Sequence, residues 1–279
     1  MAELVAGFGV PHTPLLWRLM ADDVPADLRV VSDEFARFRR LFEAARPDVV
    51  VAIGSDHFHA FDHTAMPAFL IGNADHIDGT FPNEQRAFGL PTIEIAGHCG
   101  LARALLGHHE LAGGFDFAFS NRPRLDHAYV VPLLYLMPGL DIPVVPIHTN
   151  TNAPPLPRAD RFLALGRHIR AVVDSYPVDL RVVVIATGHL AFELGGPAMF
   201  QNRSSDPVFD AEAVDLIRRN DLGTAAATFR FDRLLGAGNL TFQVLNFLAL
   251  GAAMNRPTTT AEGVACRFGH EPFFSWETP

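Results

Sequence analysis

The sequence predicts an α/β fold, in which a single domain spans residues 1–279 and helices flank a central, largely parallel or mixed sheet. Short apolar runs rich in β-branched residues are typical of strands that helices cover on both faces. Three such runs are each followed within a few residues by a histidine: 4–10 before His12, 49–53 before His57, and 182–185 before His189. Because loops at the carboxyl ends of parallel strands line ligand sites, we expect these three imidazoles to meet in one active site.

Strands and helices alternate along the chain. Strands are expected at 4–10, 49–53, 68–71, 115–119, 144–147 and 182–185, where turn residues flank most of the apolar runs. Apolar residues at helical spacing predict helices at 33–45 and 161–173, and Ser32 or Asp33 is the expected cap of the first. Further helices are expected at 210–218 and at 240–254, the latter after a turn-like segment with two glycines.

Composition narrows the functional classes. With 279 residues, 49% of them hydrophobic, the chain can bury a full core. The formal charge of −9 argues against a nucleic-acid partner, because phosphate binding needs a basic surface. Two cysteines, Cys99 and Cys266, give neither a disulfide framework nor a thiolate metal cluster. Without a recognisable leader or an apolar run long enough to span a bilayer, we expect a cytoplasmic protein with no membrane partner.

Several short motifs, taken in their order and spacing, are shared with a known family. They are Pro11-His12-Thr13-Pro14, Ser55-Asp56-His57, Leu125-Asp126-His127 with Val131-Pro132, the stretch 150–157 leading into Leu165-Gly166-Arg167, Ala237-Gly238-Asn239, Leu245-Asn246 and Gly251-Ala252. Nearly end to end, the chain resembles the class III extradiol dioxygenases, the family of the protocatechuate 4,5-dioxygenase β subunit. None of these motifs is decisive alone.

The resemblance implies a chemistry. In that family a mononuclear Fe(II), held by two histidines and one glutamate, binds a catechol through both hydroxyls and activates O2. His12 and His57 match the two histidine ligands, and His127 matches a position that faces the substrate and hydrogen-bonds a catechol oxygen. A small aromatic substrate of the catechol or aminophenol type, O2 and Fe(II) are therefore expected. So is a homodimer or a complex with a small second subunit.

Neighbouring residues receive supporting roles. Asp56 and His59 flank the second ligand, and Asp56 is expected to orient a ring or cap a turn, since ligating histidines need an outer hydrogen-bond acceptor. Asp126 is expected to set the tautomer of His127.

Three further residues are candidates for contacts with the substrate itself. Phe58 and Phe192 would wall a planar ring if they are not simply core residues. Arg122 would bind a substrate carboxylate if it is not a solvated loop charge.

The chain departs from the family pattern at two positions, the third metal ligand and the catalytic base. Gln243 stands where the family has its glutamate ligand, so either a neutral amide oxygen binds the metal more weakly or the residue has no ligand role. Phe192 stands at the usual base position, and His189, three residues earlier, would share its face on a helical turn and act as the base. Glu193, four residues after His189, would restore the missing carboxylate unless it is a solvated loop residue.

These departures leave two other functions open. One is a relative that has lost ring cleavage and serves as a partner or scaffold subunit. The other is a metal-assisted hydrolase, in which a bound water is activated. His108 and His109, beside a glycine-rich turn, are expected at the surface or outside the ligand set.

Overall fold

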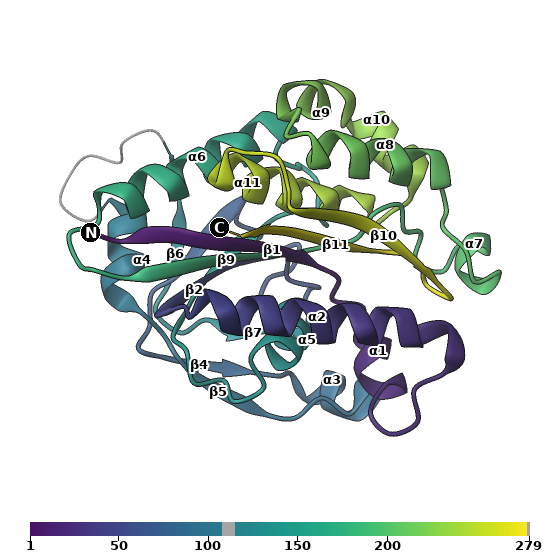
Figure 1. Cartoon of the computed structure of the whole chain (residues 1–279), viewed down its shortest axis with the longest axis horizontal. Helices are drawn as coiled ribbons and strands as arrows, with labels where there is room; N and C mark the ends of the chain where they lie inside the picture. Colours follow the sequence, from purple (N-terminus) through teal and green to yellow (C-terminus); the bar gives the residue numbers. More distant parts are fainter. Residues whose placement is uncertain (108–114, 278–279) are drawn as a thin grey trace.

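An eight-stranded mixed sheet forms the middle layer of the molecule (Figure 1). The computed structural model describes residues 1–107 and 115–277, so His108 and His109 lie outside the described residues. The strand order is β10-β11-β1-β9-β2-β8-β3-β6. Its four central strands run parallel: β1 (Glu3–Val10), β9 (Arg181–Thr187), β2 (Val49–Gly54) and β8 (Val144–Thr149). The α/β class and the largely parallel centre of the sheet are therefore as predicted.

Antiparallel pairs make the sheet mixed at both sides. β3 (Phe69–Gly72) runs antiparallel to β8 and carries β6 (Ala118–Ser120) in parallel. On the other side, β11 (Gly269–Glu277) pairs antiparallel with β1, and β10 (Thr260–Cys266) pairs with β11. A separate small sheet has the order β5-β4-β7, formed by Ile93–Ala96, His76–Gly79 and Arg124–Leu125.

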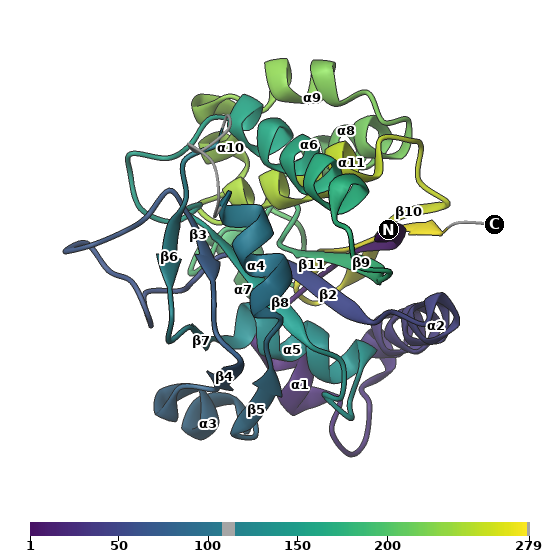
Figure 2. The ribbon, with the colours of Figure 1, turned by 90° about the vertical axis from the view of Figure 1, so that its left-hand side faces the viewer.

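Helices cover both faces of the main sheet, and each face has its own apolar core (Figures 1 and 2). One layer contains α4 (Cys99–Leu106), α6 (Ala159–Ser175), α8 (Pro207–Arg218), α9 (Leu222–Thr228), α10 (Phe231–Ala237), η2 (Thr241–Val244) and α11 (Leu245–Met254). The opposite layer contains α1 (Pro14–Leu19), η1 (Ala26–Leu28), α2 (Arg29–Ala45), α3 (Pro82–Phe88) and α5 (His127–Leu136). The short helix α7 (Pro197–Phe200) lies at the edge.

One predicted cap and one predicted continuous helix were wrong. Helix α2 begins at Arg29 because η1 leads directly into it, so neither Ser32 nor Asp33 is its cap. The helix expected at 240–254 is divided into η2 and α11. Among the described residues, no single helix has the length and apolarity of a membrane span. Phe231–Ala237 and Thr241–Met254 have the necessary length and apolarity only when taken together, and a bend of 117° separates them.

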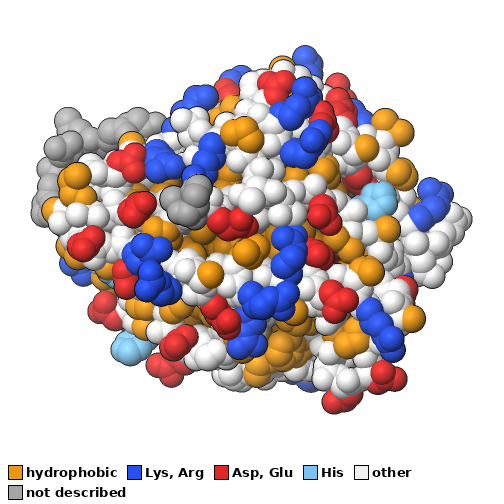
Figure 3. Space-filling view, in the orientation of Figure 1, with side chains coloured by type: hydrophobic (Ala, Val, Ile, Leu, Met, Phe, Trp, Pro, Cys, Tyr) orange, Lys and Arg blue, Asp and Glu red, His pale blue; other side chains and the backbone are white. Residues whose placement is uncertain are grey.

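The face of the molecule that carries α2 and β1 has a mixed surface (Figure 3). Acidic and basic side chains alternate there with apolar ones, and the view shows no continuous basic stripe on this face.

Candidate metal centre

Four imidazoles lie together at the carboxyl ends of the central parallel strands. His12 follows β1, His57 follows β2 and His189 follows β9, and these three strands are neighbours in the sheet. The fourth, His127, is the first residue of α5. The His12 ring centroid lies 4.6 Å from that of His189 and 5.1 Å from that of His57, and the His57 and His127 centroids are 4.2 Å apart.

A buried asparagine on α11 ties the strand ends together. Asn246 Nδ2 donates to the Thr187 carbonyl at the end of β9, at 2.8 Å, and to Ser55 Oγ after β2, at 3.3 Å. Its Oδ1 accepts from Thr149 Oγ1, on β8, at 2.7 Å. Asn246 therefore links the carboxyl ends of β9, β2 and β8. Its place in the Leu245-Asn246 motif does not predict this role.

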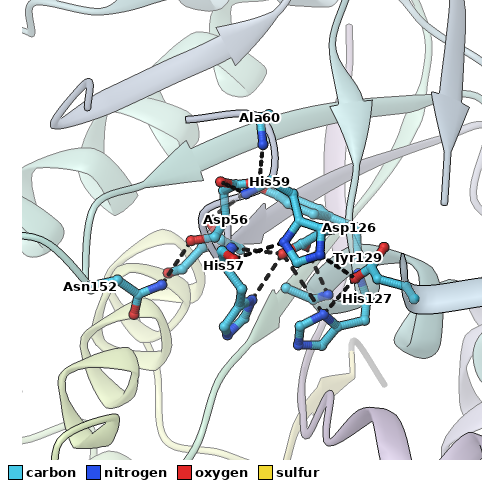
Figure 4. Close-up of polar contacts among 12 residues, drawn as sticks. Asp56, His57, His59, Ala60, Asp126, His127, Tyr129 and Asn152 are labelled. Carbon is cyan, nitrogen blue, oxygen red and sulfur yellow. Dashed lines mark hydrogen bonds and ion pairs between the residues drawn. The ribbon is translucent and has the colours of Figure 1, made fainter. Parts of the chain in front are cut away.

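Asp126 orients His57. Asp126 Oδ2 accepts the His57 backbone N–H at 2.8 Å and lies 2.9 Å from His57 Nδ1, while Oδ1 caps α5 through the Ala128 N–H (Figure 4). Although burial opposes its ionisation, the interactions with His127 and His57 hold the pKa of Asp126 below its usual value. A carboxylate that accepts from Nδ1 leaves the Nε2 lone pair of His57 available to a metal.

Glu84 does the same for His127. Glu84 Oε1 accepts the His127 backbone N–H at 2.8 Å and lies 2.7 Å from His127 Nδ1. The expectation that Asp126 sets the tautomer of His127 was wrong, since the nearest Asp126 oxygen is 3.9 Å from that Nδ1. As the cap of α5, Asp126 turns toward the β2 loop instead.

Sequence reasoning missed Glu84. Its carboxylate also accepts the Phe81 N–H, an arrangement that a glutamate three residues after a helix start often makes. That local pattern indicates a helix N-terminus and does not reveal that the side chain points inward.

Three of the four imidazoles are buried, and burial lowers the pKa of each. Burial, together with the neighbouring His189, His57 and His127, lowers the pKa of His12 well below its usual value. Burial and the other imidazoles also lower the pKa of His189 to about 3, and burial is the main cause of the lowered pKa of His127. At neutral pH these rings carry free lone pairs.

This donor set fits a divalent cation. His12, His57 and His127 each offer one ring nitrogen, and the three atoms lie within 4.8 Å of one another. Both ring nitrogens of His12 are buried without a hydrogen-bond partner within the described part of the chain. Unpaired buried polar atoms are costly, and a metal ion would satisfy one of them.

Gln243 faces the same cluster. Its side chain is fully buried, and its Nε2 lies 3.0 Å from Nε2 of His57. Its Oε1 has no partner among the described residues. Gly188 permits this approach, because a Cβ there would lie 2.5 Å from the Gln243 carbonyl oxygen.

Phe192 and Glu193 lie in an irregular segment, so the helical turn expected after His189 was wrong. The Phe192 ring stacks on the His189 ring at a centroid distance of 4.7 Å. The Glu193 carboxylate folds back on its own turn, where a Cβ at Gly196 would lie 2.1 Å from Oε2. This places it in that turn and not among the residues that could hold a metal.

Asp56 shapes the turn after β2. Its carboxylate accepts the backbone N–H groups of His59, Ala60 and Phe61 at 2.9 to 3.1 Å (Figure 4). His59 Nδ1 is hydrogen-bonded to the His57 carbonyl, and His59 Nε2 lies 2.9 Å from Asn83 Nδ2. Asp56 therefore caps a turn, one of its two expected roles, and it does not orient a ligand ring.

Two residues expected to contact substrate lie away from the imidazoles. Phe58 is 45% exposed and its ring contacts His63. Arg122 lines a separate cavity of about 260 Å³, whose other lining residues include Asp56, Tyr129 and His148. None of the four clustered imidazoles lines that cavity.

The fold and the site define a class: an α/β protein with a buried polyhistidine centre at the carboxyl ends of parallel strands. The family model described as the catalytic LigB subunit of aromatic ring-opening dioxygenase matches residues 6–267, and the chain belongs to this family.

Curated relatives include 2,3-dihydroxyphenylpropionate/2,3-dihydroxicinnamic acid 1,2-dioxygenases. Those of Klebsiella pneumoniae (strain 342) and Pseudomonas putida are each 31% identical over 183 residues, which is 65% of this chain and 54% of theirs. The match thus spans about half the length of these relatives. A solved structure, of the uncharacterized protein JW3007 from Escherichia coli K12, covers 97% of this chain and 99% of its own with a TM-score of 0.61. At 15% identity it supports the fold alone.

Proposed function

We propose that the protein is an Fe(II)-dependent extradiol dioxygenase that opens a small catechol-type or aminophenol-type ring with O2. The convergence of four imidazoles, in a chain of the LigB family, is the observation that carries this proposal. His12 and His57 would hold the iron, with Gln243 beside them. Bound Fe(II) would supply Lewis acidity and a path for electrons from the substrate ring to O2, so that the ring is oxidised and O2 is reduced.

The chain's own residues would orient the ligands and move protons. Asp126 and Glu84 hold the Nδ1–H groups of His57 and His127, so each ring presents Nε2 to the centre of the cluster. The His189 ring lies 4.6 Å from the His12 ring, centroid to centroid, so a ring nitrogen of His189 would accept the proton of a substrate hydroxyl held at the metal. The Phe192 ring, stacked on His189, holds that base in place and restricts water on one side.

Oxygen uptake tests the proposal directly. Protein loaded with Fe(II) without oxygen should bind close to one iron per chain. It should then consume O2 with at least one member of a panel of catechols and aminophenols, giving a yellow ring-opened product. His12→Ala should abolish uptake, while His76→Ala, at a side chain that is 79% exposed on β4, should not. Iron binding without uptake across the panel would reject the dioxygenase and favour a partner or scaffold subunit.

A second candidate function is a metal-assisted hydrolase. Three neutral imidazoles around one ion also form the ligand set with which zinc activates a bound water. Zinc-loaded protein that hydrolyses activated esters, together with iron-loaded protein that consumes no O2, would favour this function over ring cleavage.

A further inference from the structure

His57 and His127 are held by the same kind of contact, although they come from different elements. Each gives its own backbone N–H and its Nδ1–H to one carboxylate: His57 to Asp126 at 2.8 and 2.9 Å, and His127 to Glu84 at 2.8 and 2.7 Å. Their rings lie side by side, tilted by 32°, and both point away from the turn at Asp56 (Figure 4). If this contact prepares His57 as a metal ligand, it prepares His127 equally.

Gln243 is arranged differently. Since Asp126 accepts the Nδ1–H of His57, the amide N–H of Gln243 donates to the Nε2 lone pair of that ring, at 3.0 Å. This is the lone pair that a metal needs. Gln243 therefore competes for His57, and it has no negative charge to offer an ion.

The two carboxylates behind the rings provide that charge. Asp126 and Glu84 are at most 1% exposed, and their ion-pair partners among the described residues are histidines, without an arginine. Buried carboxylates without a cation are costly, and a divalent ion in front of the imidazoles would balance two of them.

We propose that His127 is the third metal ligand of this chain, completing a set of three imidazoles with His12 and His57, and that Gln243 lies outside the ligand set. In this arrangement the carboxylates of Asp126 and Glu84 carry the negative charge of the centre, and each is hydrogen-bonded to a ligand imidazole without contacting the ion. The inference rests on the proposed metal-dependent function, and it moves His127 from a substrate contact to a ligand.

Titration of the metal-free protein with Co(II), in competition with a chelator and without oxygen, tests this arrangement. Glu84→Gln keeps the shape of the clamp and removes its charge, so it should weaken Co(II) binding about 10- to 100-fold. His127→Ala should weaken binding more than Glu84→Gln does. Gln243→Ala frees the lone pair of His57, so this variant should bind Co(II) at least as tightly as the unaltered protein. The control His76→Ala should bind Co(II) as tightly as the unaltered protein.

A count of imidazole ligands by X-ray absorption or pulsed EPR keeps the proposal testable if His127→Ala folds poorly. Three imidazoles are expected in the unaltered protein and in Gln243→Ala, and two in His127→Gln. Unchanged affinity in the His127 variants, or a loss confined to Gln243→Ala, would overturn the proposal. Binding that survives His12→Ala but is lost in Glu84→Gln would also overturn it, because the ion would then lie between the carboxylates.

These outcomes are independent of ring cleavage. A protein that binds Co(II) through three imidazoles but consumes no O2 with iron would reject the dioxygenase and leave the ligand assignment intact. If His127→Ala keeps both oxygen uptake and full metal affinity, the assignment of His127 as a ligand is rejected and the dioxygenase proposal stands.

Discussion

Gln243→Glu places a carboxylate at the position where the resemblance drawn from the sequence implies a glutamate ligand. In the unaltered protein the amide is fully buried and 3.0 Å from His57 Nε2, with Asp126 on the far side of the same ring. Without metal, the introduced carboxylate has no cation to pair with. Its pKa should therefore lie above the value of about 4.3 that it has in the unfolded chain.

The sign of the pH effect follows from that shift. Between the unfolded and the folded pKa the native state binds more protons, so the metal-free variant should lose stability as the pH rises through this window. At pH 8 we expect a free energy of unfolding several kcal/mol below that of the unaltered protein, and a smaller difference at pH 5.

A bound metal ion should offset this loss of stability, because the introduced carboxylate attracts the ion. A pair of unit charges about 4 Å apart interacts by about 4 kcal/mol at an effective dielectric constant of 20, and a divalent ion doubles this. Loss of the proton from a carboxyl whose pKa is raised in the metal-free protein costs several kcal/mol, which leaves a gain on the order of 3 kcal/mol, or ~100-fold in affinity. Chelator competition with Fe(II) under nitrogen and urea unfolding of the metal-free protein measure the two effects, with Gln243→Ala as the uncharged control. Unchanged affinity together with unchanged stability would refute the placement of this side chain beside the ion.

Three further changes test other parts of the protein. Asp126→Asn removes the negative charge behind the His57 Nδ1–H and should weaken Fe(II) binding about 10- to 100-fold in the same competition assay. An affinity within twofold of the unaltered protein would argue against this role of Asp126. Glu271 is fully buried beside Thr13, and burial raises its pKa to about 7, so native stability should fall between about pH 4.5 and 7. Glu271→Gln should flatten that profile by about 3 kcal/mol in denaturant titrations, and an unaltered slope would contradict the assignment. His189→Ala should sharply lower kcat while iron content stays near one per chain, and full turnover would remove His189 from proton transfer.

The strand-end histidines could be predicted because the evidence for them is local. An apolar β-branched run followed by His12, His57 or His189 indicates a strand, and it places the imidazole at the carboxyl end of that strand. Neighbouring parallel strands then bring the rings together without any knowledge of loop details.

The partners of those histidines depend on tertiary structure. Glu84 reaches His127 because α3 and α5 both pack against α1, and no spacing within the chain reports that contact. Helical spacing failed for His189 and Glu193, because the segment that follows β9 is irregular and turns at Gly195. The buried helix α5, apolar on all sides and carrying Pro132, lacks the amphipathic pattern on which helix prediction depends.

Diffraction from crystals loaded with Fe(II) in the absence of oxygen, measured at the iron absorption edge, tests the central claim most directly. We predict one strong anomalous peak, about 2.0 to 2.2 Å from a ring nitrogen of each of His12, His57 and His127. A fully loaded crystal with no peak among these imidazoles, or with a peak that His12 does not contact, would contradict the account.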